Sequence, residues 1–141
     1  MPVERDDSII ELCRQTLERL AASVPATQLS CHMRVGGVLR VVAASGGLRL
    51  IYEVPESEGG ICWRAARTGE PQLVEDVRSD PEYIATDERV LAEVAVPVTG
   101  GDDVLLVLDA EFAERSFLPE EAEAVQAEAA ALESAIRERA Q

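Results

Sequence analysis

Residues 59–97 read GGICWRAARTGEPQLVEDVRSDPEYIATDERVLAEVAVP, and the rest of the chain is organised around this stretch. Its pattern predicts a short helix, a turn at Gly69 and Glu70, a short strand, a long polar connector and a buried strand. Long connectors in small domains commonly carry binding residues. We therefore expect residues 59–97 to form the lid and one wall of a ligand pocket.

Length and charge limit the classes of function. Of the 141 residues 47% are hydrophobic, which predicts a single domain over residues 1–141 with one core. The net charge is −14, and all 13 basic residues are arginines. Such a charge repels phosphate backbones and anionic lipid, so we expect neither nucleic acid nor a membrane surface as a partner.

The chain carries no signal for export or membrane insertion. Its first residues, MPVERDDS, are acidic and lack the apolar segment of a signal peptide. No apolar run approaches the roughly 18–20 residues of a membrane-spanning helix. Cys13, Cys31 and Cys62 are an odd number without CxxC spacing, which is typical of neither a disulfide framework nor a zinc site. We expect a protein of the reducing cytoplasm.

The N-terminal region, residues 1–24, is predicted to be helical. The helix should run over residues 7–22, with Ser8 and Glu11 forming a capping box. Apolar residues recur along it at spacings of three and four. This stripe comprises Ile10, Cys13, Leu17, Leu20 and Val24. A thiol on such a stripe is predicted to be a core residue.

Strands should follow this helix. Residues 29–35 alternate strictly between apolar and polar side chains, and Gly36 and Gly37 supply a hairpin turn to a strand over residues 38–44. A shorter strand is predicted over residues 48–52.

His32 is the only histidine in the chain, and it falls on the polar face of its predicted strand. As a haem or metal ligand it would need further ligands, and the sequence places none beside it. We therefore predict no metal and no cofactor.

A second hairpin is predicted from strands over residues 92–98 and 104–112. Apolar residues share one face of each strand. They are Val94, Val96 and Val98 on the first strand, and Val104, Leu106 and Leu108 on the second. Glu93, Asp109 and Glu111 occupy the opposite faces, so their carboxylates should point to the side where the connector lies.

The C-terminal region, residues 117–141, is predicted to form a helix that begins at Pro119. Its apolar residues repeat every three and four positions, close to a heptad seam. They are Leu118, Ala122, Val125, Ala129, Leu132 and Ile136, and small residues at Ala127, Ala130 and Ala131 widen the surface. This surface could pack within the chain or against a second subunit.

Together these elements predict an α+β domain. A central antiparallel sheet of five to six strands would carry both terminal helices on one face. The irregular connector and the short helix would form a pocket on the other face.

The order of elements and three motifs resemble the GAF domain family of small-molecule sensing modules. The motifs are GICWRAARTG at residues 60–69, DV at 76–77 with DP at 80–81, and AEVAVP at 92–97. The family usually shows G-x-x-G-x-A-x-x-T-G, D-V and S-E-x-x-V-P, so the second glycine and the serine are replaced here. The family's terminal helices commonly pair, and the resemblance therefore implies a homodimer and a possible signalling partner.

Within the family the pattern is most similar to free methionine-R-sulfoxide reductases. That enzyme type carries the motifs G-x-C-G-T-A, H-I-A-C-D, S-E-I-V-x-P and L-D-x-D. At the corresponding positions this chain has GIC at 60–62, YIATD at 83–87, AE at 92–93 and LDAE at 108–111. Cys62 matches one family cysteine, whereas Thr86 occupies the catalytic position and Tyr52 a third. The acids that the resemblance implies for substrate binding are all present. They are Glu93, Asp109 and Glu111.

The threonine decides the expected chemistry. Reducing a sulfoxide needs a nucleophilic thiolate and a second thiol that resolves the sulfenic acid. Thr86 cannot replace that thiolate, and Cys62 alone would depend on an external thiol. We predict a reductase-like pocket without redox catalysis, with a divergent reductase using Cys62 as an alternative.

The acidic residues predict the charge of the ligand. Three carboxylates that face one cavity repel each other, so their pKa values should be raised when the pocket is empty. The ammonium group of a free amino acid or small amine would relieve this repulsion. Arg64, Arg67 or Arg89 could hold a ligand carboxylate or could neutralise the acids. Alternatively, the acids could be solvated strand ends.

Further ligand-binding residues are predicted from the same stretch. Trp63 and Tyr83 would supply aromatic walls, or would pack the connector against the sheet. Cys62, Thr86 and Asp87 stand at positions of the reductase-like motifs.

Other ligands of GAF domains fit this sequence poorly. The N-K-F-D-E motif of cyclic-nucleotide binders is absent, and a bilin-binding cysteine usually has a histidine beside it, whereas Cys62 precedes Trp63. The leading prediction is a sensor for a polar, amine-bearing metabolite. A ligand-free dimerisation module is the second.

Overall fold

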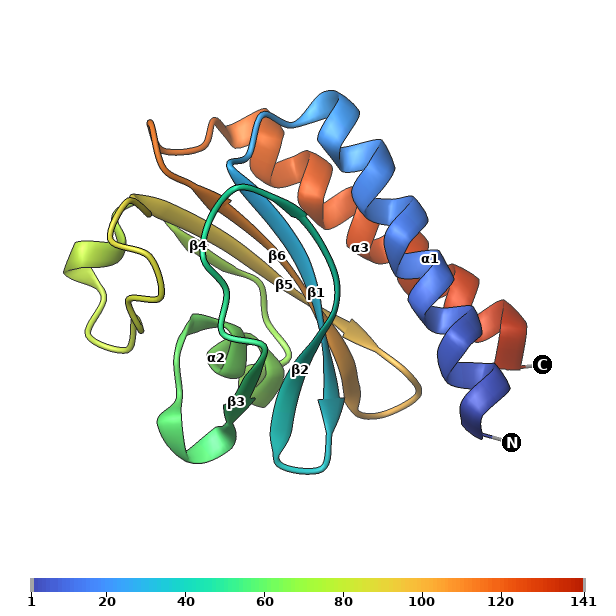
Figure 1. Ribbon diagram of the computed structural model, residues 1–141. Helices are drawn as coiled ribbons and strands as arrows, with labels where there is room; N and C mark the ends of the chain where they lie inside the picture. Colours follow the sequence, from blue (N-terminus) through green and yellow to red (C-terminus); the bar gives the residue numbers. More distant parts are fainter. Residues whose placement is uncertain (1, 141) are drawn as a thin grey trace.

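The computed structural model describes the backbone of residues 2–140 and the side chains of residues 7–139. Two long helices, α1 (Pro2–Ser23) and α3 (Pro119–Ala140), lie side by side on one face of an antiparallel sheet (Figure 1). The short helix α2 (Ile61–Thr68) lies on the other face. This arrangement confirms the predicted α+β architecture.

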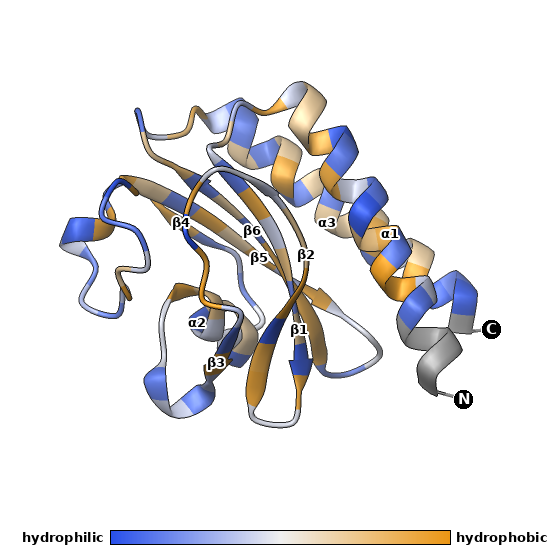
Figure 2. Cartoon of the chain, viewed as in Figure 1, coloured by the Kyte–Doolittle hydropathy of each residue, from blue (hydrophilic) through white to orange (hydrophobic). Residues whose placement is uncertain are grey.

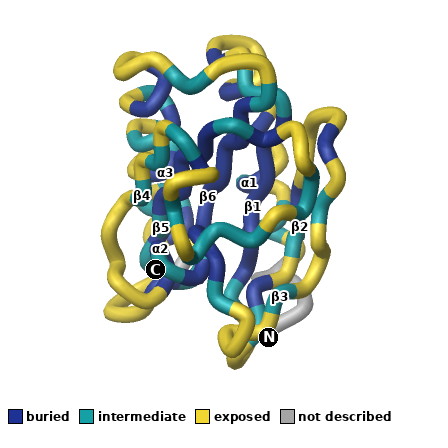
Figure 3. The backbone as a smooth tube through the Cα atoms, turned by 90° about the vertical axis from the view of Figure 1, so that its left-hand side faces the viewer, coloured by how far each residue is buried: buried dark blue, intermediate teal, exposed yellow. Residues whose placement is uncertain are grey.

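The six-stranded sheet has the order β3-β2-β1-β6-β5-β4, and every neighbouring pair is antiparallel. Its strands are β1 (Gln28–Val35), β2 (Val38–Gly46), β3 (Glu53–Pro55), β4 (Gln72–Val74), β5 (Ala92–Thr99) and β6 (Val104–Phe112). The central strands β1, β6 and β5 are buried along most of their length (Figure 3). The pairing of β1 with β6 therefore joins the two predicted hairpins in the middle of the sheet.

The larger core lies between the sheet and the terminal helices. Apolar side chains of α1 and α3 pack there against β1, β5 and β6. Bands of apolar and polar residues alternate along both helices, as a surface helix requires (Figure 2). Cys13 and Cys31 are fully buried in this core, which confirms that Cys13 is a core residue.

Two details of the terminal helices differ from the prediction. Because α1 begins at Pro2, Ser8 lies inside the helix, and the predicted capping box is wrong. The core side chain of this turn is Ile9, whereas Ile10 is half-buried. At α3, Leu118 precedes the helix and is exposed, because the buried stripe starts only at Ala122.

The predicted strand over residues 48–52 is wrong, since β3 starts only at Glu53. The backbone N–H groups of Leu48 and Arg49 bind side-chain oxygens of Gln28 and Asp87, both at 3.0 Å. They are therefore not available for a strand ladder. The segment instead crosses to the α2 face of the sheet, where Leu50 and Ile51 line a cavity.

A smaller core lies between α2, the connector and the other face of the sheet. Trp63 and Ala65 of α2 pack there with Ala95 and Val107 of the sheet. Val104 belongs to this core and not to the face of Leu106 and Leu108, because the β5–β6 register shifts next to Thr99.

No helix in the described part of the chain is both long and apolar enough to cross a lipid bilayer.

Candidate functional site

Three buried carboxyl groups converge on the α2 face of the sheet. Glu93 lies on β5, Asp109 and Glu111 lie on β6, and each residue is at most 5% exposed. Oxygen atoms of the three carboxyl groups lie within 4.8 Å of one another. The acids therefore point to the connector side, as predicted. Their burial excludes the alternative that they are solvated strand ends.

Burial and mutual repulsion raise the pKa of all three carboxyl groups. The pKa of Glu93 is raised mainly by burial, and that of Asp109 is raised well above its usual range by burial and by the charge of Glu93. Burial, followed by the charges of Glu93 and Asp87, raises the pKa of Glu111 to about 8. The carboxyl groups therefore hold protons near neutral pH, and a bound cation would replace these protons.

The three arginines that could have neutralised the cluster bind elsewhere. Arg64 and Arg67 both bind Glu82, and Arg64 also binds Asp80 at 2.6 Å. Arg89 forms its salt bridge within the connector. Among the described side chains, no salt bridge reaches the buried acids, so the cluster has no internal counter-ion.

A cavity of about 70 Å³ lies beside the acids and is also lined by residues of α2 and the connector. This volume accommodates about five water molecules or a small polar group. Apolar side chains form much of its wall, including Leu39, Leu50, Ile51, Val54, Ile61 and Ile84. Because Ile51 is exposed, the cavity reaches the surface beside this residue. Apolar walls with a few convergent polar groups are the usual lining of a ligand site.

The two predicted aromatic residues differ in their surroundings. Trp63 is fully buried, donates a hydrogen bond from Nε1 to the Val54 carbonyl at 2.8 Å and packs beneath the Arg34 guanidinium. Tyr83 lines the cavity, and its buried hydroxyl lacks a hydrogen-bond partner within the described residues. Trp63 also lines the cavity, so it forms part of the wall as well as packing α2 against the sheet, and the Tyr83 hydroxyl is available to a ligand.

Cys62 reaches the cavity from the first turn of α2. The helix starts after Gly60, whose φ of 99° favours glycine, and a Cβ there would lie 3.1 Å from Ile84 Cδ1, close enough to push that side chain aside. The Cys62 thiol donates to Oε2 of Glu93 at 3.7 Å. Burial, reinforced by the charge of Asp109, raises the pKa of the Cys62 thiol well above its usual range, so it is not a thiolate near neutral pH.

Of the two predicted connector residues, Thr86 and Asp87, only Thr86 lines the cavity. Thr86 lines the cavity, and its contact with a ligand stays a prediction. Asp87 does not line the cavity, because its carboxylate accepts hydrogen bonds from the Arg49 backbone at 3.0 Å and from the Arg89 guanidinium at 2.8 Å. The Arg89 pairing also holds the pKa of Asp87 below its usual range. In this arrangement Asp87 ties the segment over residues 48–52 to the connector.

His32 is the cavity residue that sequence reasoning missed. It lies on β1, is 7% exposed, and has a pKa lowered to about 4 by burial, so it is neutral. A ring nitrogen lies within 4.8 Å of Cys62 Sγ and a carboxylate oxygen of Asp109. The polar face of β1 was visible in the sequence. What was missing was the pairing of β1 with β6, which sets Ser30 opposite Asp109.

A family model described as a GAF domain matches residues 6–137. The chain belongs to the GAF domain family. Protein ZMO0507 of Zymomonas mobilis subsp. mobilis is 38% identical to this GAF domain over 53 residues, which are 37% of the domain and 33% of that relative. The match thus spans about a third of the length of the relative.

Solved structures share the fold of this GAF domain. A free methionine-R-sulfoxide reductase from Neisseria meningitidis, in complex with its substrate, has a TM-score of 0.82 and 21% identity, covering 94% of this domain and 81% of that chain. The type II enzyme from Thermoplasma acidophilum has a TM-score of 0.81 and 19% identity, covering 95% of both chains. The Thermosynechococcus elongatus PixJ GAF-domain has a TM-score of 0.78 and 15% identity, and the match covers 99% of this domain and 90% of that chain.

These neighbours include reductases and a light-absorbing receptor domain, so the likeness at these identities shows the fold alone. The finding confirms the predicted resemblance to the GAF family and to its reductase-like members.

Proposed function

We propose that this GAF domain binds a small amine-bearing metabolite in the cavity beside Glu93, Asp109 and Glu111. The observation that carries the proposal is the set of three buried carboxyl groups without a cationic partner among the described side chains. An ammonium group supplies a positive charge and up to three N–H donors to such a cluster. The Tyr83 hydroxyl offers an additional polar contact.

The size of the cavity favours a compact ligand. About 70 Å³ suits the ammonium end of an amino acid or a small monoamine, and the rest of a longer ligand would extend past Ile51. The reductase neighbours act on free methionine-R-sulfoxide, which is itself an amino acid. The cavity also favours ligand binding over a collapsed, ligand-free dimerisation module.

A sensing role without redox catalysis is the second part of the proposal. Cys62 is the cysteine at the cavity, and Cys13 and Cys31 lie in the core on the opposite face of the sheet. A sulfenic acid at Cys62 would therefore have no resolving thiol within the chain. Thr86 lines the cavity but supplies no thiol. This separation favours binding over turnover, in a domain that we place in the cytoplasm.

The terminal helices are the proposed route of output to a second subunit or a signalling partner. They pack against each other, with Arg19 of α1 paired to Glu128 of α3 at 3.0 Å. The α3 face that carries Ala127, Ala130 and Ala131 is exposed and offers a smooth surface for a homodimer.

Isothermal titration calorimetry with EDTA-treated protein tests the binding proposal. We expect saturable heats with at least one of glycine, methionine, methionine sulfoxide and small monoamines, and none with N-acetylmethionine, which lacks the ammonium group. Loss of a charge-assisted hydrogen bond, about 1.5–3 kcal/mol, should weaken binding roughly 10- to 150-fold in Glu93→Gln and Glu111→Gln.

Glu75→Gln serves as the matched control, because Glu75 is an exposed acid away from the cavity. It should leave the amine affinity unchanged. The proposal is wrong if none of these amines binds at millimolar concentration, or if Glu75→Gln weakens binding as much as the cavity variants do.

A further inference from the structure

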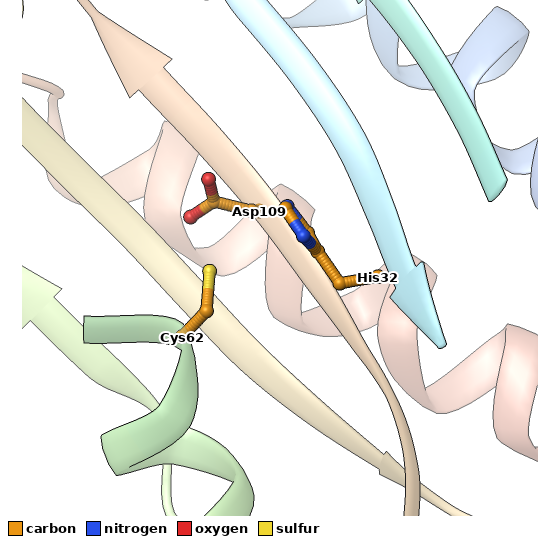
Figure 4. A group of neighbouring side chains, drawn as sticks. All are labelled: His32, Cys62 and Asp109. Carbon is orange, nitrogen blue, oxygen red and sulfur yellow. The ribbon is translucent and has the colours of Figure 1, made fainter. Parts of the chain in front are cut away.

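Donor atoms of three different types meet at the inner end of the cavity. His32 comes from β1, Cys62 from the first turn of α2 and Asp109 from β6. One donor atom from each lies within 4.8 Å of the other two. Figure 4 shows the Cys62 sulfur directed toward the Asp109 carboxylate, with the His32 imidazole beside them.

Asp109 carries an unsatisfied polar atom at this point. The residue is 3% exposed, and its Oδ1 has no hydrogen-bond partner within the described residues. A buried carboxylate oxygen without a donor destabilises a protein, and a bound ion is one of the partners that can satisfy it. Together with the neighbouring imidazole and thiol, it indicates a cation that accepts nitrogen, sulfur and oxygen ligands.

We propose that His32, Cys62 and Asp109 bind a divalent transition-metal ion, with Zn²⁺ as the best match. Zn²⁺ accepts thiolate, imidazole and carboxylate ligands at about 2.0–2.3 Å, which separates tetrahedral ligands by about 3.3–3.7 Å. Atoms within 4.8 Å of one another reach that geometry when each moves by no more than about 1 Å, within the range of side-chain adjustment.

The surroundings orient the donors for such an ion. Ser30 Oγ lies 2.9 Å from His32 Nε2, so it fixes the ring and leaves Nδ1 for a metal. Helix α2 holds Cys62 in place, because the neighbouring Trp63 is fully buried and hydrogen-bonded to Val54. Glu93 Oε2, 3.7 Å from the Cys62 sulfur, is near enough to act as a fourth ligand or to accept a proton from a metal-bound water.

The donor set also discriminates between cations. Mg²⁺ and Ca²⁺ prefer shells of oxygen atoms, so an imidazole and a thiol disfavour them. Borderline ions such as Zn²⁺ and Co²⁺ accept this mixture of ligands. The carboxyl groups of Glu93 and Glu111, which lose their protons when a cation binds, add attraction for a divalent ion over a monovalent one.

This site goes beyond the proposed amine sensor; it shares Asp109 with the amine site and has Glu93 of that site beside it. Metal binding depends on His32 and Cys62, whereas amine binding depends on Glu93 and Glu111. Amine binding is measured on EDTA-treated protein without added metal, so each proposal can fail while the other stands.

Cobalt substitution followed by zinc competition tests the site. The EDTA-treated 141-residue protein is titrated with Co²⁺, and its absorption spectrum is recorded at each addition. We expect one equivalent to bind per chain and to produce a near-ultraviolet charge-transfer band, which requires a thiolate ligand, and Zn²⁺ should displace the Co²⁺.

Cys62→Ser should remove the band, and His32→Gln and Asp109→Asn should weaken Zn²⁺ binding by at least about a hundredfold. Ser30→Ala should weaken it about 10- to 100-fold, as expected for a residue that orients a ligand.

Cys13→Ala is the matched control, because Cys13 is a buried thiol in the opposite core. It should keep the band and the Zn²⁺ affinity. Thermal melts of each variant separate loss of binding from loss of folding. The proposal is overturned if Co²⁺ produces no thiolate band, if Cys62→Ser binds Zn²⁺ like the parent protein, or if Mg²⁺ binds as tightly as Zn²⁺. Amine binding that persists in any of these cases would leave the sensor proposal standing.

Discussion

Glu93 and Glu111 lie directly opposite each other on β5 and β6, and both are buried. Like charges in a cross-strand pair destabilise a sheet, and burial adds the cost of desolvation. The fold tolerates the pair because protons reduce its charge when no cation is bound. The stability of the domain is therefore coupled to pH through this pair.

The first prediction concerns Glu111. Its pKa of about 8 in the folded protein lies above the ordinary 4.5, so between these values the folded protein keeps a proton that the unfolded chain has lost. Stability should therefore fall as the pH rises from about 5 to about 8, by roughly 2–4 kcal/mol. Glu111→Gln should flatten this dependence, as measured by urea unfolding across that range.

The groups that face Glu111 are Glu93 and Asp109 from the sheet and Asp87 from the connector. Glu75→Gln, at an exposed acid, should retain the slope of the parent protein. An unchanged slope in Glu111→Gln would show that another group causes the pH dependence.

The second prediction concerns Trp63, which packs α2 against the sheet. Trp63→Phe keeps an aromatic ring but leaves the Val54 carbonyl without its donor and removes part of a fully buried side chain. We expect a loss of about 1–3 kcal/mol in the free energy of unfolding, measured by urea denaturation. Leu73→Ala, at a residue that is 47% exposed, should stay within about 0.5 kcal/mol of the parent. Equal losses in both variants would contradict this role.

The third prediction concerns the tie between Asp87 and Arg49. Asp87→Asn removes the charge that binds Arg89 and weakens the acceptor of the Arg49 N–H. Hydrogen exchange of the Arg49 amide should accelerate, while amides of β1 keep their protection. Asp76→Asn is a matched control, because Asp76 makes the same bonds to Arg78 in an exposed turn. If both variants change the Arg49 exchange rate equally, the tie has no specific effect.

The fourth prediction concerns the exposed face of α3. If this face forms a homodimer, the protein should sediment as a dimer at micromolar concentration, and Ala127→Arg should shift it to a monomer. Glu75→Arg introduces the same side chain at an exposed position outside α3 and serves as a control that should leave a dimer intact. A monomeric parent protein would instead favour the alternative in which the terminal helices pack only within the chain.

The amino-acid pattern was sufficient to predict most elements and the face of each strand. The alternation of Glu93, Asp109 and Glu111 with buried apolar residues sets three acids on one face of the second hairpin, because side chains of a strand alternate between faces. The local pattern gave a wrong prediction where backbone N–H groups form hydrogen bonds to residues distant in the sequence. The strand predicted over residues 48–52 is absent because Gln28 and Asp87 take its N–H groups.

Tertiary structure alone decided what surrounds the acids. An arginine can neutralise the cluster only if the fold places its guanidinium beside the three acids. Arg64 instead binds Asp80 and Glu82. Likewise, His32 is 30 positions from Cys62 and 77 from Asp109 in the chain, and no local pattern links them. The antiparallel pairing of β1 with β6, and the packing of α2 across that pair, bring the three side chains together. The sequence thus determined which charged groups share a face, and the packing of distant elements decided that these groups border one cavity without a counter-ion among the described side chains.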